Sequence, residues 1–148
     1  MTLTPIQSRA LLTYAGTLPF IAAAISLASS YAYFPIIGDV SQAVVVYALV
    51  IAAFMAGSQW GMQFAQSDRW ARRLQLFTNL NAICLWLAFV LLPFAWLIVV
   101  LMSSFLAALW LDLQLWRASL ITRDYWRARW TAITIVVLSL VVVGMSIN

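Results

Sequence analysis

Long apolar runs, separated by short polar segments, make up most of this chain. Five of these runs are close to the ~20 residues that a helix needs to cross the hydrocarbon core of a membrane. They predict an all-α fold, in which five transmembrane helices form a single bundle and one membrane domain over residues 1–148. The predicted helices cover residues 10–33, 42–66, 74–92, 94–116 and 130–147.

The first run has two interpretations. Pro19 lies inside it, and a proline tends to kink a membrane helix at a point that neighbouring helices then stabilise. Arg9 before the run and the small residues at 28–30 after it are also typical of a cleaved signal peptide. Because the run is longer than the apolar core of most signal peptides, we expect it to be a membrane helix.

The second run carries two stripes, which an α-helix places on nearly opposite faces. Gln59 and Gln63 lie on one stripe, and small residues recur every four positions on the other. Small residues let two helices approach closely in lipid, so this run is expected at the centre of the bundle. The small-residue seam consists of Ala53, Gly57, Gly61 and Ala65.

The basic residues predict how the chain is oriented. All eight are arginines, and the five-helix model places every one of them on the same side of the membrane. Because basic loops stay in the cytoplasm, we expect a cytoplasmic N-terminus and an external C-terminus. The arginines are Arg9 before the first helix, Arg69, Arg72 and Arg73 between the second and third, and Arg117, Arg123, Arg127 and Arg129 between the fourth and fifth.

Polar side chains within the helices gather in the half of the membrane next to these arginines. Nothing polar continues to the other side, which argues against a pore through the membrane. Two interpretations stay open: the polar side chains bind each other and hold the helices together, or they line a cytoplasm-facing recess for a polar head group. The predicted recess residues are Gln59, Gln63, Asn79, Asn81 and Asp112.

Asp112 is the only ionisable side chain within a predicted helix, and such a carboxylate is normally paired with a cation. Either it belongs to the recess or it forms a structural ion pair with Arg72, Arg127 or Arg129. The arginines and tryptophans of the two basic segments are typical of a membrane interface. The arginines expected to meet anionic lipid are Arg72, Arg73, Arg127 and Arg129.

Composition narrows the class of protein. With 66% hydrophobic and 8% charged residues, the chain is too apolar for a soluble domain. It contains no histidine and one cysteine, so the usual metal ligand and the usual general base are missing. We therefore expect no enzyme, no catalytic residue, no metal and no cofactor. The net charge of +4 is explained by membrane topology, so nucleic-acid binding is not expected.

A family resemblance adds to this interpretation. Tyr47, Phe54, Gly57, Trp60 and Gly61 resemble a pattern of the family of small membrane proteins that includes the mitochondrial transmembrane protein 69 (domain-of-unknown-function family 3429). The resemblance implies an inner membrane, bacterial or mitochondrial, and no established activity. Further similar pieces are Tyr14 to Gly16, Pro19 with Phe20, Asp112, and Arg127 to Thr131.

The expected function is that of a non-enzymatic accessory, assembly or scaffold protein of the bacterial inner membrane. Its expected partners are the lipid bilayer and either another membrane protein or a second copy of itself. The alternative is a binding protein for an amphiphile, a quinone or a phospholipid, with its head group in the recess.

Overall fold

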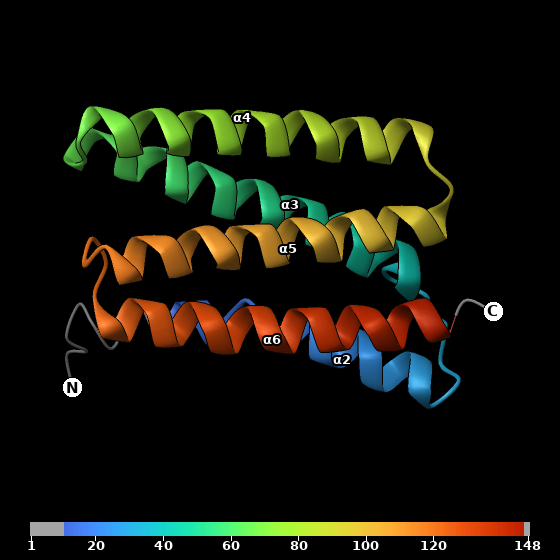
Figure 1. Ribbon diagram of the computed structural model, residues 1–148. Helices are drawn as coiled ribbons and strands as arrows, with labels where there is room; N and C mark the ends of the chain where they lie inside the picture. Colours follow the sequence, from blue (N-terminus) through green and yellow to red (C-terminus); the bar gives the residue numbers. More distant parts are fainter. Residues whose placement is uncertain (1–10, 147–148) are drawn as a thin grey trace.

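A computed structural model describes residues 11–146, and within that range five helices are long and apolar enough to cross a membrane. They lie side by side as one bundle, which confirms the predicted fold class (Figure 1). The helices are α2 (Leu18–Ala28), preceded by helical residues 11–15, then α3 (Val40–Met62), α4 (Asp68–Leu91), α5 (Phe94–Arg117) and α6 (Arg123–Met145).

The first span is interrupted where the sequence predicts a kink. Residues 11–15 are helical, the chain turns at Gly16 and Thr17, and α2 then begins with Pro19 in its first turn. Proline has no N–H, so a helix that ran through it would lose a backbone hydrogen bond. A neighbouring helix stabilises the break, because the Tyr47 hydroxyl donates to the Gly16 carbonyl at 3.1 Å.

A small hairpin joins α2 to α3. α2 ends at Ala28, before the predicted limit at residue 33, because Ser29 and Ser30 leave the helical conformation. Strands β1 (Tyr33–Phe34) and β2 (Gly38–Asp39) then pair antiparallel, with Gly38 at a positive φ of 76°. The Asp39 carboxylate caps α3 by accepting from the Gln42 N–H at 2.8 Å.

α4 and α6 both begin before the apolar runs that predicted them. α4 starts at Asp68 and α6 at Arg123, so most of the two basic segments are helical instead of loop. Asp68 and Asp124 place negative charge in the first turns, where a helix favours it. The Thr122 hydroxyl also accepts from the Tyr125 N–H, which caps α6. The arginines of these segments are therefore held on rigid helices.

Two helices share the centre of the bundle. α3 contacts α2, α4 and α5, while α5 contacts α3, α4 and α6, so the predicted central position of α3 is shared with α5. A short 3₁₀ turn, η1 (Gln63–Ala65), extends α3 towards α4. Apolar side chains fill most of the core, among them Phe20, Ala48, Leu101, Phe105, Leu140 and Val143.

The connections between helices alternate between the two ends of the bundle. The α3–α4 and α5–α6 turns lie at the same end, and the α4–α5 turn lies at the other end (Figure 1). Arg69, Arg72, Arg73, Arg117, Arg123 and Arg127 lie in or beside the first pair of turns. We call the end of the bundle with these two turns the arginine end, and the opposite end the far end. Arg9 lies outside the described residues.

Candidate functional site

Three helices contribute one side chain each to a buried polar network near the arginine end. Gln59 of α3 donates from Nε2 to Asp112 Oδ1 at 2.9 Å and to the Ala108 carbonyl at 3.1 Å. Arg129 of α6 donates from Nε to Asp112 Oδ2 at 2.8 Å. Gln59 and the side chain of Asp112 are 0% exposed, and the side chain of Arg129 is 11% exposed. The network fixes α3, α5 and α6 relative to one another.

Helical spacing explains why these residues meet. On α6, Arg129 precedes the buried residues Ile133, Val136 and Leu140 by four, seven and eleven positions, so it lies on the inner face of the helix. On α5, Asp112 lies four positions after the buried Ala108. The charge of Asp112 is balanced by Arg129, as a carboxylate within a membrane requires.

The hydrogen bonding of this region is incomplete. Among residues 11–146, the buried side-chain atoms without a hydrogen-bond partner are Gln59 Oε1, Gln63 Nε2 and Arg129 Nη2, and the Tyr125 hydroxyl has Ser58 beside it. Tyr125 lies one turn before Arg129 on α6, and the Arg129 guanidinium lies over its ring at 5.7 Å. An unpaired buried polar group costs about 1–3 kcal/mol, so these atoms favour binding a further polar group.

A cavity of about 190 Å³ lies beside this network, between the start of the first span, α3 and α6. Arg129 and Tyr125 line it, together with Ser58 on α3. Most of the remaining lining is apolar or small: Leu12, Thr13, Gly16, Thr17, Ile51, Phe54, Met55, Ala132, Ile133 and Val136.

The cavity has a polar end and an apolar end. On α6 the lining runs from Tyr125 and Arg129 near the arginine end to Val136 deeper in the bundle. On α3, which runs in the opposite direction, Ser58 lies nearer the arginine end and Ile51 lies deeper. Both helices therefore give the cavity the same gradient, from hydrogen-bonding groups to hydrocarbon.

The structure brings together only part of the predicted recess. Gln59 and Asp112 meet in the network, and Gln63 is buried with its side-chain oxygen accepting from Gln75. Asn79 is exposed on α4 and donates to the Gln75 carbonyl within its own helix, while Asn81 is half-buried. None of the five predicted residues lines this cavity, so the cavity is a different candidate site, and a recess lined by those five residues stays a prediction.

The sequence analysis named one of these two α6 residues and missed the other. Arg129 was expected at the lipid interface and was also one of three candidate partners for Asp112, whereas Tyr125 was given no role because its segment was taken as a loop. The structure places Arg129 inside the bundle, paired with Asp112, which confirms the ion pair as one of the two interpretations of Asp112. The signal that could have found them is the buried stripe of α6, which extends back through Arg129 to Tyr125 by steps of four residues.

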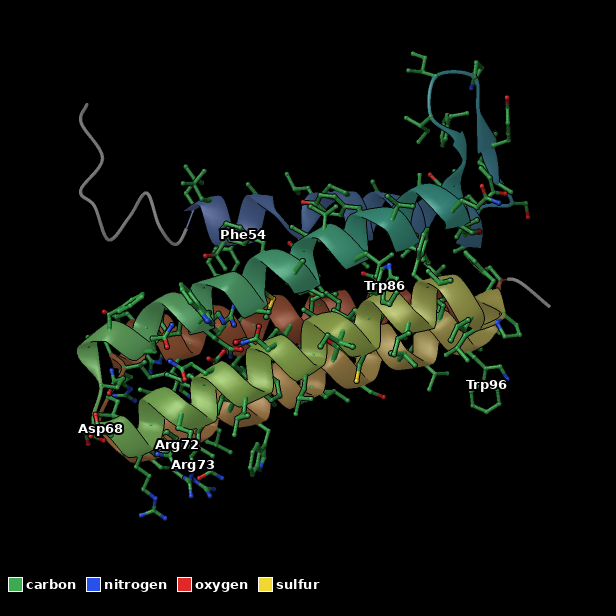
Figure 2. All side chains as sticks on the ribbon, turned by 90° about the horizontal axis from the view of Figure 1, so that it is seen from above. Phe54, Asp68, Arg72, Arg73, Trp86 and Trp96 are labelled. Carbon is green, nitrogen blue, oxygen red and sulfur yellow. The ribbon has the colours of Figure 1, made fainter. Side chains whose placement is uncertain are left out.

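The other predicted interface arginines lie at the surface. Arg72, Arg73 and Arg127 are exposed, and Arg72 and Arg73 project from the start of α4 (Figure 2). Arg73 lies over the Trp70 ring at 5.2 Å, an arrangement in which an aromatic side chain orients a cation. Trp96, at the far end, points away from the bundle (Figure 2).

The small-residue seam lies on the outer face of α3. Ala53, Gly57, Gly61 and Ala65 are all exposed, and a Cβ added to Gly57 or Gly61 would meet no atom within 4 Å. The contacts of α3 within the described chain use the opposite face, which carries Ala52, Met55, Ala56 and Gln59. The seam therefore does not pack helices together within the described residues, and packing against another chain stays a prediction.

Within residues 11–146, no three His, Cys, Asp or Glu side chains are grouped in a way that could hold a metal ion. In the part of the chain that the structure describes, the charged group that lines the cavity is the guanidinium of Arg129, and it is paired with Asp112. The arrangement is suited to binding a molecule with an apolar body and a polar end.

Comparisons with known proteins identify the family. Searches of curated proteins and of solved structures found no match. The sequence pattern of one family matches residues 6–145, almost the whole chain. The chain therefore belongs to the family described as "Protein of unknown function (DUF3429)", and its five apolar helices are those of a multi-pass membrane protein.

Proposed function

We propose that this protein is a non-enzymatic, multi-pass protein of the bacterial inner membrane that binds an amphiphile in the cavity between the first span, α3 and α6. The observation that carries the proposal is the cavity's gradient, from Tyr125 and Arg129 at one end to Ile51 and Val136 at the other. A membrane-embedded amphiphile has the same gradient, with its polar end at the membrane surface and its chain in the hydrocarbon.

The size of the cavity supports such a ligand. An engineered apolar cavity of about 150 Å³ binds benzene, and this one is about 190 Å³. Along α6 the lining from Tyr125 to Val136 spans roughly 16 Å at the helical rise of ~1.5 Å per residue. A single ring or several methylene groups fit this space, and a whole phospholipid would leave its remaining bulk in the bilayer.

The lining supports binding without catalysis. It contains no carboxylate, cysteine or histidine, so general acid–base and nucleophilic steps lack their usual groups. An inner-membrane location is supported by the exposed arginines at one end of the bundle, which fit the cytoplasmic surface of an anionic membrane.

Native mass spectrometry of the gently extracted protein tests the proposal. The wild type is expected to retain a lipid-sized or quinone-sized mass, and Ala132→Trp, which fills the cavity, is expected to reduce its occupancy at least ten-fold. Ala82→Trp is the matched control, because Ala82 is exposed on α4 and does not line the cavity. A wild type without any retained amphiphile, or equal occupancy in both variants, would contradict the proposal.

The role of an accessory or scaffold protein is a second candidate, favoured by the outer face of α3. The seam offers open space at Gly57 and Gly61, and the aromatic side chains beside it, Phe54 and Phe64, are 72% and 78% exposed. A helix of a partner membrane protein could approach closely there, with the aromatic rings packed along its sides.

A further inference from the structure

The unpartnered polar atoms beside the cavity point to the chemistry of the ligand's polar end. We propose, building on the amphiphile-binding function above, that this end is a neutral carbonyl group, which accepts hydrogen bonds from Arg129 and Tyr125. The inference concerns the class of head group, and it can fail while the amphiphile-binding function stands.

Arg129 and Tyr125 offer hydrogen-bond donors to a ligand. Arg129 Nη2 is a donor and a guanidinium has no acceptor, so its missing partner must accept. The Tyr125 hydroxyl has Ser58 beside it, and a hydroxyl that accepts from Ser58 still has its own hydrogen to donate. Both residues line the same end of the cavity, and the guanidinium lies over the tyrosine ring at 5.7 Å. An oxygen entering between the two side chains would accept from both.

The charges around the cavity favour a neutral ligand. Arg129 is already balanced by Asp112, whose carboxylate lies 2.8 Å from Nε and is fully buried. Among the described residues, no other charged side chain lines the cavity. A carboxylate or phosphate would therefore leave one uncompensated negative charge in a poorly solvated site, and an ammonium would leave a positive one. A neutral acceptor leaves the ion pair balanced.

The apolar lining next to the polar end limits the length of the ligand's polar group. The apolar lining begins about one turn after Arg129, at Ala132 and Ile133, so only a short polar group fits between the guanidinium and the hydrocarbon part. An ester, a ketone or a quinone presents one carbonyl oxygen directly on an apolar body. The carbonyl is the chemistry that these sources share.

A matched set of probes tests the inference on the full-length protein in nanodiscs of neutral lipid. The probes are radiolabelled methyl dodecanoate, dodecanoate and dodecylamine, which share a chain length but are neutral, anionic and cationic at pH 8. Methyl dodecanoate is expected to bind at least ten-fold more tightly than either charged probe. A decyl-substituted benzoquinone forms a fourth arm, and its affinity relative to the ester tells whether the carbonyl belongs to a ring or to a chain.

Tyr125→Phe provides the residue-level test, because it removes the hydroxyl and keeps the ring. We expect it to weaken binding of the neutral probes about three- to ten-fold, the usual range for one hydrogen bond. Tyr33→Phe is the control, because Tyr33 is exposed in β1, away from the cavity.

The outcomes separate the two proposals. If no probe binds, amphiphile binding itself is wrong. If probes bind but dodecanoate or dodecylamine binds as tightly as the ester, the carbonyl assignment is overturned and the cavity remains a binding site. The assignment is also overturned if Tyr125→Phe binds the neutral probes as tightly as the wild type.

Discussion

The two ends of the bundle are held together by different interactions. At the far end, buried apolar side chains of α5 and α6 belong to the same core cluster, among them Leu97, Ile98, Leu140 and Val143. At the arginine end, the same two helices meet through the Asp112–Arg129 ion pair, and Gln59 connects α3 to it. One pair of helices therefore combines an apolar contact and an ionic contact along its length.

This difference shows what specifies helix packing in lipid. Apolar side chains gain little on leaving lipid for the bundle, because both surroundings are hydrocarbon, so the far end depends on close packing. A buried ion pair has a defined geometry, and removing one partner leaves an unpaired charge. We infer that the arginine end fixes the register of α3, α5 and α6.

The largest expected effect concerns which end faces the cytoplasm. A reporter that is active only in the cytoplasm, fused after Asn148, is expected to be silent, and one that is active only outside the cytoplasm is expected to work. The same reporters inserted after Ala118, in the α5–α6 turn, should give the opposite result. A cytoplasmic signal from the C-terminal fusion would overturn the orientation and place the polar network at the outer surface.

Breaking the ion pair is expected to have the next largest effect. Arg129→Leu leaves Asp112 buried without a cation, and we expect it to lower the free energy of unfolding by about 3–5 kcal/mol. Unfolding in mixed detergent micelles, followed by tryptophan fluorescence, measures this change. Arg127→Leu is the control, because Arg127 is exposed two positions earlier on α6.

A double variant separates the ion pair from general packing. Asp112→Leu with Arg129→Leu removes both charges, so most of the lost stability is expected to return. If the double variant is as unstable as Arg129→Leu alone, the charges are not what holds the arginine end together. The difference between the two ends would then lie in packing alone.

The smallest expected effect on stability concerns the seam. Gly57→Leu with Gly61→Leu places bulk in open space, so we expect the free energy of unfolding of the monomer to change by no more than about 0.5 kcal/mol. The same variant is expected to abolish association of α3 with a partner, measured by cross-linking in the membrane. Association that persists would rule out the seam as the contact.

Much of the fold was predictable, because long apolar runs specify membrane helices almost by length alone. The starts of α4 and α6 were missed because hydropathy assigns arginines to loops. The acidic residue in the first turn favours both helix starts, and the Thr122 cap adds to it at α6; these signals are present in the sequence.

The site was less predictable, because it depends on how each helix is rotated. Gln59 and Asp112 were found, since polar residues in an apolar helix are conspicuous in the sequence. On α4 the buried residues Leu74, Thr78 and Leu85 define the inner face. Asn81 shares that face, three positions after Thr78 and four before Leu85, and is half-buried, whereas Asn79 is exposed outside it.

The break before Pro19 has a mechanical consequence for the cavity. Leu12 and Thr13 form part of its wall, yet they precede the turn at Gly16 and Thr17 and do not belong to α2 itself. The position of this part of the wall is therefore set by the turn and not by the packing of α2 on α6. The hydrogen bond from the Tyr47 hydroxyl to the Gly16 carbonyl connects the turn to α3, so one contact outside the cavity determines where this wall lies.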